Sequence, residues 1–267
     1  MKRLPAASLS KHEIELVLVD SASSDGTSRL MRDFAASAPF AVRAVVVDKK
    51  GSGLARGRGV AVAGGDLLVF TDDDCYLPED YFDYLLPVMS RGEFHFGGGA
   101  IELFNGEVPI GGDRPQASER IPPHSLLSAG TIQGGNMFFR RAVFDRAGLF
   151  REEFGAGAHF SGDDIEMATR ASLLGFAGVR LPGLKVYHDN PRQPGTQAHD
   201  DRRREYDVGR GAYYASLIAS GHLLAWQLWG QVSLRPVEGG ISKKALKTLE
   251  RELRGAADFI AASLGEE

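Results

Sequence analysis

Cysteine, excess positive charge and long apolar runs are all scarce in this sequence. Its single cysteine, Cys75, excludes an internal disulfide and fits a reducing compartment. The formal net charge of -4 argues against nucleic acid as the main partner, because such a partner favours a basic face. No apolar run reaches the roughly 18 residues of a membrane-spanning helix, and the first residues lack the apolar core of a signal peptide. We therefore expect a cytoplasmic protein, with association to the cytoplasmic face of a membrane as an alternative.

The first part of the chain alternates short apolar runs with helical segments. The runs have the β-branched, apolar character of buried parallel strands, and they cover 15–20, 41–48 and 66–71. The helical segments cover 27–36, 54–65 and 78–89. Strands that alternate with helices predict an α/β fold with a doubly wound, mostly parallel sheet.

After Ser90 the alternation is less regular. The expected elements are a strand at 94–104, a long loop at 105–130, a strand that turns into a helix at 134–150, a helix at 161–175 and a strand at 179–190. A final amphipathic helix is expected near 242–264. The simplest division is a catalytic domain, 1–200, and a helical C-terminal appendage, 201–267.

The aromatic stretch 212–230 has two interpretations. It carries Tyr213, Tyr214, Trp226 and Trp229 with few charges, which favours weak peripheral contact with a membrane interface. The alternative is that this helix packs against the catalytic domain, in which case both tryptophans are buried.

Three adjacent acids, Asp72, Asp73 and Asp74, directly follow the third apolar run. Ligands bind beyond the carboxyl ends of strands in open parallel sheets. Adjacent carboxylates repel one another, and a bound cation would reduce this repulsion. Carboxylate oxygens are hard ligands that suit Mg²⁺ or Mn²⁺. The alternative is that these acids interact only with the dipole of the next helix, although Glu79 and Asp80 already serve that purpose.

The adjacent acids Asp163 and Asp164 precede a helix. Each raises the pKa of the other, which suits a general base, but helix capping explains them equally well. His188 ends a strand in a polar setting, where it is either a metal ligand, a phosphate contact or a surface histidine without a role.

Other polar and small residues at strand and loop ends are candidates for ligand contact. Asp20 either accepts a hydrogen bond from a nucleoside or serves a turn. Arg56 either meets phosphate or is solvated. The segment Gly134, Gly135 and Asn136 either permits close approach of a ligand or shapes a turn.

The order of these segments resembles that of glycosyltransferase family 2, over about residues 14–192. The matching segments are VDSASSDGT with Asp20, GSGLAR with Arg56, FTDDDCYLPEDYF with Asp72 and Asp74, GGNMFFRRAVFDRAGLF, GDDIEMATRASLLG and VYHDN with His188. Each segment is common alone, whereas all six in order are specific. Two positions depart from the family: Asp163 stands where Glu is usual, and Gly57 stands where Asn is usual, which loosens a diphosphate contact.

The resemblance implies a GT-A fold and an inverting, metal-dependent transfer of a sugar from a nucleotide diphosphate to an acceptor hydroxyl. Asp164 would be the catalytic base. The implied donor-nucleotide residues are Asp20, Arg56, Asp72 and Asp73, the implied metal ligands are Asp74, Asp72 and His188 with Mn²⁺ or Mg²⁺, and the implied acceptor-side residues are Gly134, Gly135, Asn136 and Asp163. A sugar or a lipid-linked acceptor, in cell-surface polysaccharide or glycolipid synthesis, is the expected partner.

Two rival functions remain open. A non-catalytic nucleotide- or sugar-binding remnant would keep the fold, but the retained metal and base acids argue against it. A nucleotidyltransferase of similar architecture usually shows a glycine-rich, basic loop after its first strand, and none is visible here. Release of nucleoside diphosphate rather than pyrophosphate would separate these classes.

Members of the resembled family usually begin with a further strand and helix before the VD segment. Only residues 1–13 precede Ile14 here, and they form no apolar strand. We therefore expect the first β-α unit to be absent, which leaves unpaired edges between the strands at 15–20 and 66–71. A late start site, a fragment whose strand comes from elsewhere and a degenerate protein without activity would each account for this.

Overall fold

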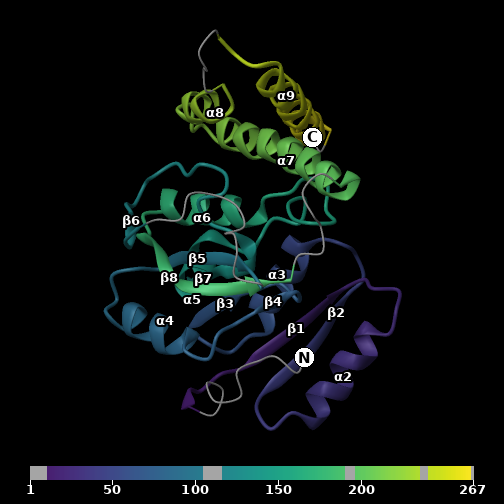
Figure 1. Ribbon diagram of the computed structural model, residues 1–267, viewed down its shortest axis with the longest axis vertical. Helices are drawn as coiled ribbons and strands as arrows, with labels where there is room; N and C mark the ends of the chain where they lie inside the picture. Colours follow the sequence, from purple (N-terminus) through teal and green to yellow (C-terminus); the bar gives the residue numbers. More distant parts are fainter. Residues whose placement is uncertain (1–10, 105–115, 190–195, 235–239, 266–267) are drawn as a thin grey trace.

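The computed structural model describes residues 11–104, 116–189, 196–234 and 240–265. Strands and helices alternate from β1 to β3, and the α/β class predicted from the sequence is confirmed (Figure 1). The elements up to α4 are β1 (Leu16–Ser21), α2 (Thr27–Ser37), β2 (Val42–Val47), α3 (Ser52–Val62), β3 (Leu67–Phe70), β4 (Cys75–Tyr76) and α4 (Tyr81–Ser90).

The second half of the chain completes the sheet and adds three C-terminal helices. Its elements are β5 (Phe96–Leu103), β6 (Glu119–Ile121), the 3-10 helix η1 (Gly134–Asn136), β7 (Met137–Arg140), α5 (Arg141–Ala147), α6 (Asp163–Leu173), β8 (Gly178–His188), α7 (Gln197–Ala219), α8 (Ala225–Ser233) and α9 (Lys243–Leu264). The short strand β6 falls in the segment expected to be loop, of which residues 105–115 lie outside the described residues.

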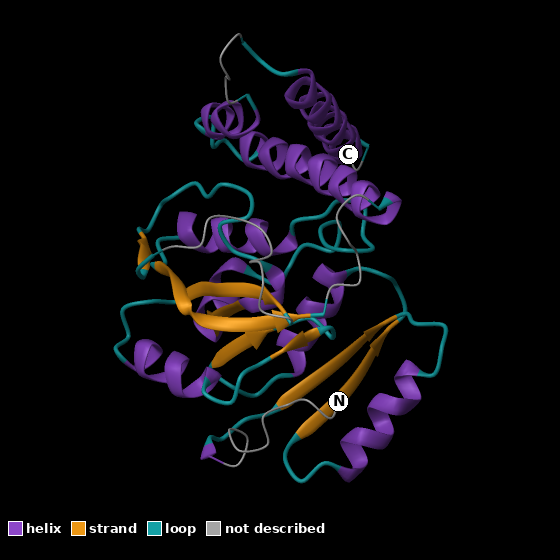
Figure 2. Cartoon of the chain, in the orientation of Figure 1, coloured by secondary structure: helices purple, strands orange, loops and turns teal. Residues whose placement is uncertain are grey.

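The larger sheet lies at the centre of the molecule (Figure 2). Its strand order is β3-β7-β5-β8-β4, with β6 paired to β8. Its longest ladder, β5 with β8, is parallel, whereas β7, β4 and β6 pair antiparallel. Successive side chains of a strand point to opposite faces. Phe138 accordingly packs with α4 on one face, and Phe139 joins the core beneath α5 and α6 on the other.

A separate sheet consists of β1 and β2 in parallel register, from Leu16 opposite Val42 to Ser21 opposite Val47. Within the described residues, neither the outer edge of β1 nor that of β3 pairs with another strand. Both edges line a cleft of about 1790 Å³. Residues 11–13 form no strand, and residues 1–10 lie outside the described part. The unpaired edges expected from the sequence are therefore present in the described structure.

The three C-terminal helices pack on one another and on the catalytic domain. Gly211 of α7 and Gly255 of α9 permit their close crossing, because a Cβ would lie 1.7 Å from the Glu252 carbonyl oxygen and 2.0 Å from that of Val208, respectively. Phe259 of α9 packs against Phe154 in the same continuous core. The predicted boundary at residue 200 falls within the first turn of α7.

The two tryptophans of the aromatic stretch differ in environment. Trp229 is 4% exposed, whereas Trp226 is 63% exposed. Trp229 is buried against α7 and α9, the other helices of the C-terminal region, so its burial does not show the expected packing on the catalytic domain. Among the described residues, every helix falls short of the length or apolarity needed to cross a bilayer.

Candidate active site

The acidic segment after β3 forms a tight turn into β4. The Cys75 amide donates to the Asp72 carbonyl oxygen at 3.1 Å. Antiparallel pairing of β4 with β8 sets Cys75 opposite His188, and the Asp189 amide donates to the Asp74 carbonyl oxygen at 2.9 Å. This pairing brings together two segments that lie far apart in the sequence.

The result is a cluster of four potential metal ligands. Ligand atoms of Asp72, Asp74, Cys75 and His188 all lie within 4.8 Å of one another, and His188 Nε2 is 3.2 Å from Asp74 Oδ1. Burial, with the negative charge of Asp72 and Asp73, raises the pKa of Asp74, while His188 opposes the shift. Two carboxylates and an imidazole are suitable ligands for Mn²⁺, and a cation there would relieve the repulsion between the acids.

Cys75 was not predicted to join this cluster. In the sequence, only its position directly after the acids pointed to a place in this cluster. The direction of its side chain depends on the pairing of β4 with β8, which the local sequence does not reveal. Burial raises the pKa of its thiol to about 12, with the charge of Asp72 adding to the effect. The protonated thiol is a poor ligand for a hard cation.

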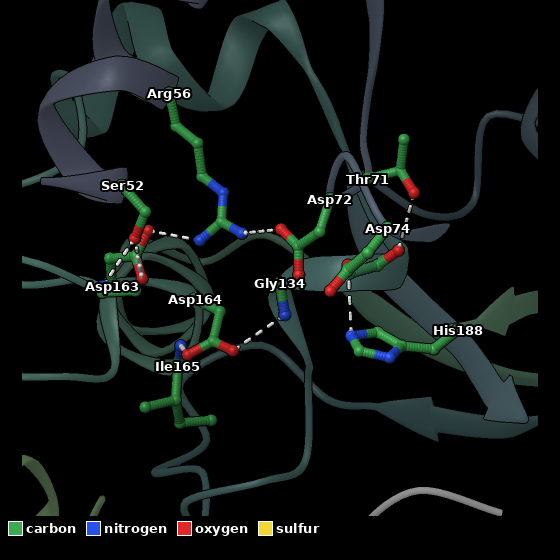
Figure 3. Close-up of polar contacts among 12 residues, drawn as sticks. Ser52, Arg56, Thr71, Asp72, Asp74, Gly134, Asp163, Asp164, Ile165 and His188 are labelled. Carbon is green, nitrogen blue, oxygen red and sulfur yellow. Dashed lines mark hydrogen bonds and ion pairs between the residues drawn. The ribbon is translucent and has the colours of Figure 1, made fainter. Parts of the chain in front are cut away.

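Arg56 connects this cluster of potential metal ligands to the start of α6. Figure 3 shows its guanidinium between two carboxylates: Nη2 donates to Asp72 Oδ1 at 2.9 Å and Nη1 to Asp163 Oδ2 at 2.5 Å. The Arg56 side chain is only 14% exposed. Ser52 Oγ also donates to Asp163, at 3.3 Å. The structure thus places Arg56 in an ion-pair bridge, and its predicted contact with donor phosphate stays a prediction.

Asp164 lies on the other side of this bridge. Its carboxylate accepts hydrogen bonds from the backbone amides of Gly134 at 2.8 Å and Ile165 at 2.7 Å (Figure 3). Burial, followed by the charge of Asp163, raises the pKa of Asp164 to about 6, although Arg56 opposes the shift. A carboxyl group of this pKa can accept a proton near neutral pH.

The residues of η1 form the floor between the two acidic groups. A Cβ on Gly134 would lie 2.5 Å from the Arg56 guanidinium, and one on Gly135 would lie 3.2 Å from Asp72 Oδ2. Asn136 is different, because it is fully buried and bonded to Tyr81, to the Ala100 carbonyl and to the Leu184 carbonyl. Asn136 supports the floor from behind and is not among the residues that line the cleft, and its acceptor-side role stays a prediction.

The remaining predicted donor residues lie at the ends of β1 and β3. Asp20 is buried and accepts hydrogen bonds from the Ser23 amide, at 3.0 Å, and from the Ser28 hydroxyl. These bonds lower its pKa, so it stays ionised. Asp73 is exposed beside the cluster. Both line the same cleft as Asp72 and Asp164, and contact with a nucleotide stays a prediction for each.

No feature of the sequence indicates that α7 contributes to this cleft. His199, Arg203 and Tyr206, from the first turns of α7, line it with the acids. Their approach depends on how closely α7 packs on the segment before α6, where a Cβ on Gly209 would lie 2.1 Å from Ser161 Oγ.

Comparison of the sequence with known protein families agrees with the enzyme class that the acids at the strand ends indicate. The sequence profile described as Glycosyl transferase family 2 matches residues 6–148, which is more than half of the chain. The chain belongs to glycosyl transferase family 2. A family relative, "Glycosyltransferase AglE" of Haloferax volcanii, is 24% identical over 241 residues, covering 85% of this chain and 72% of the relative.

Solved structures of glycosyltransferases share the fold of this family 2 chain. The mannosyltransferase PcManGT from Pyrobaculum calidifontis, in complex with GDP-Man and Mn²⁺, matches with a TM-score of 0.56 and 18% identity, over 94% of this chain and 70% of that one. S. aureus TarS 1-349, in complex with UDP-GlcNAc, matches with a TM-score of 0.61 and 17% identity, over 96% and 75%. The chain is therefore a glycosyltransferase with a GT-A fold.

Proposed function

We propose that this glycosyltransferase transfers a sugar from a nucleotide-diphosphate donor to an acceptor hydroxyl, with inversion at the anomeric carbon. One observation carries the proposal: a cluster of metal-ligating side chains and a carboxyl group of raised pKa share the floor formed by Gly134 and Gly135. The complexes of PcManGT with GDP-Man and of TarS with UDP-GlcNAc support a nucleotide-sugar donor.

Asp72, Asp74 and His188 would hold a divalent cation, Mn²⁺ or Mg²⁺. Asp72 uses Oδ1 for Arg56, and its Oδ2 lies toward Gly135, so that oxygen is available for a ligand. A bound cation would neutralise charge on the leaving nucleoside diphosphate. His188 already contacts Asp74, which orients both side chains without the cation.

Asp164 is the proposed general base. The two backbone amides that bond its carboxylate fix the direction of its oxygens toward the cleft floor. In the proposed reaction the acceptor hydroxyl loses its proton to Asp164 and attacks the anomeric carbon from the face opposite the leaving group. Asp163 is not proposed as the base, because its carboxylate oxygens already accept hydrogen bonds from Arg56 and Ser52.

The acceptor is proposed to be a sugar or a lipid-linked molecule, as in cell-surface polysaccharide or glycolipid assembly. The exposed apolar residues at the start of α8 support a location of the acceptor at a membrane surface.

Nucleotide binding tests the proposal directly. Binding of UDP and GDP is measured by thermal shift and calorimetry with and without Mn²⁺, followed by assays for released nucleoside diphosphate with the matching sugar nucleotides. Asp74→Ala should abolish the Mn²⁺-dependent part of binding while the fold persists. The control is Asp80→Ala, which removes a nearby exposed acid outside the cluster. Unchanged Mn²⁺-dependent affinity in Asp74→Ala, or release of pyrophosphate in place of nucleoside diphosphate, would contradict the proposal.

A further inference from the structure

The turn between α7 and α8 places large apolar side chains in solvent. Leu223 is 71% exposed, Leu224 66% and Trp226 63%. Between Arg210 and Arg235 the sequence contains no Asp, Glu, Lys or Arg. Leu223, Leu224 and Trp226, called here the apolar tip, therefore form an exposed surface with no charged side chain next to them in the sequence.

The apolar tip is a fixed part of the fold. Trp226 meets Trp229 edge to face, with ring centroids 5.5 Å apart. Trp229 in turn stacks on Tyr214 of α7 at 5.7 Å and donates its indole N–H to buried Glu252 of α9 at 2.7 Å. The base of the tip is therefore held by both neighbouring helices, while the tip itself remains exposed.

Three lysines lie at the start of α9. Lys243, Lys244 and Lys247 are exposed, and none of their ammonium groups has a hydrogen bond or an ion pair with another described residue. Basic residues at a helix N-terminus oppose the helix dipole, and the first turn of α9 contains no acid. Local helix stability therefore does not explain these charges.

The apolar tip and the lysines lie at the same end of the molecule. Figure 1 shows α8 and the start of α9 at the end opposite β1 and β2. The bond from Trp229 to Glu252 joins the two helices directly. An apolar tip at the same end of the molecule as unpaired positive charge matches the interface of an anionic bilayer, where Trp and Leu enter the headgroup region and Lys binds the lipid phosphates.

We propose that the apolar tip and these lysines dock the protein on an anionic lipid bilayer. α7 has 23 residues and is about 35 Å long. Its first turns line the active-site cleft, and its other end carries the tip. Docking at the tip therefore leaves the cleft open to an acceptor carried at the membrane surface. Docking on the bilayer requires neither the sugar donor nor the cation, so it is tested independently of the transfer reaction.

Vesicle co-sedimentation of the full chain tests this docking. The probes are vesicles of phosphatidylcholine with phosphatidylglycerol and vesicles of phosphatidylcholine alone. The chain should bind the anionic vesicles, and Leu223→Ser/Leu224→Ser/Trp226→Ser should lower that binding at least about tenfold. Lys→Gln changes at 243, 244 and 247 should each lower it by about fivefold, with a weaker effect at high salt.

A matched control is available on α9. Leu253→Ser/Ile260→Ser/Leu264→Ser removes three apolar side chains of 47%, 47% and 69% exposure outside the tip and should leave vesicle binding unchanged. Tryptophan fluorescence should shift to the blue on binding, and Trp226→Phe should remove the shift, since Trp229 is already buried. Equal loss in the control variant, or no vesicle binding by the unaltered chain, would overturn the proposal. Tip-dependent dimerisation without vesicle binding would instead assign the surface to a second copy of this chain.

Discussion

Replacing Asp164 by Asn removes the proposed base with little change of shape. Turnover should fall by at least about a hundredfold, which is the usual scale for losing a general base, while donor binding is kept. Because the pKa of Asp164 is raised to about 6, turnover of the unaltered enzyme should fall as the pH drops below about 6 and the base becomes protonated.

The same substitution should also change stability, with a sign that depends on pH. The pKa of Asp164 rises from 3.8, the ordinary value, to about 6 in the folded protein. The folded state thus binds the proton more tightly, and the protein loses stability as the pH rises from about 4 to about 6. Two pKa units correspond to ~3 kcal/mol. Asn avoids this loss but offers one acceptor oxygen to two amides, which costs about 1 kcal/mol.

Asp164→Asn should therefore be more stable than the unaltered protein by about 2 kcal/mol above pH 6, and this gain should vanish near pH 4. Asp163→Asn is the matched control. It removes one of the two carboxylates that pair with Arg56, whose side chain is mostly buried, so it should destabilise the fold by about 3 kcal/mol. Urea unfolding at pH 5 and pH 8, with kcat and KM for each variant, measures both effects.

Two results would refute this reasoning. If Asp163→Asn reduced turnover more than Asp164→Asn, with both variants folded, the base would be assigned to the wrong acid. If the stability difference between Asp164→Asn and the unaltered protein were the same at pH 5 and pH 8, the raised pKa of Asp164 would be wrong.

Two further predictions follow from the floor of the site and from the cleft. Gly134→Ala places a Cβ 2.5 Å from the Arg56 guanidinium, so it should displace that side chain and lower kcat at least about tenfold while the overall fold is kept. Steady-state kinetics measures kcat, and circular dichroism checks the fold. A normal kcat would show that the Arg56 side chain adjusts freely. The unpaired edges of β1 and β3 should make the protein self-associate. Val17→Lys in β1 should lower the rate of self-association measured by light scattering. An unchanged rate would show that another surface is responsible.

Local sequence pattern determined the positions of the acidic groups. The apolar runs that become β1 and β3 lead directly to Asp20 and Asp72, because a strand delivers its last residues, and those that follow it, to one edge of the sheet. The family resemblance, read from six short segments in order, is confirmed by the family match and supplied the fold and the enzyme class. The unpaired edges of β1 and β3 among the described residues agree with the expectation from the sequence, in which residues 1–13 contain no apolar run.

Only the tertiary structure decided which side chains meet. Arg56 bridges Asp72 and Asp163 because α3 and α6 approach the end of β3 together, and no local pattern encodes that approach. Cys75 joins the cluster of potential metal ligands through the pairing of β4 with β8, a contact across more than a hundred residues. Asn136 belongs to the segment that forms the floor, yet its side chain lies on the buried side.

The aromatic stretch shows the same limit. Its composition favoured both a membrane contact and a packed helix, and each tryptophan fits one of the two. Trp229 is buried because α7 and α9 cross beside it, and Trp226 is exposed because it lies in the first turn of α8, where neither helix covers it. Composition fixes which side chains are apolar, but burial depends on neighbours that arrive from distant parts of the chain.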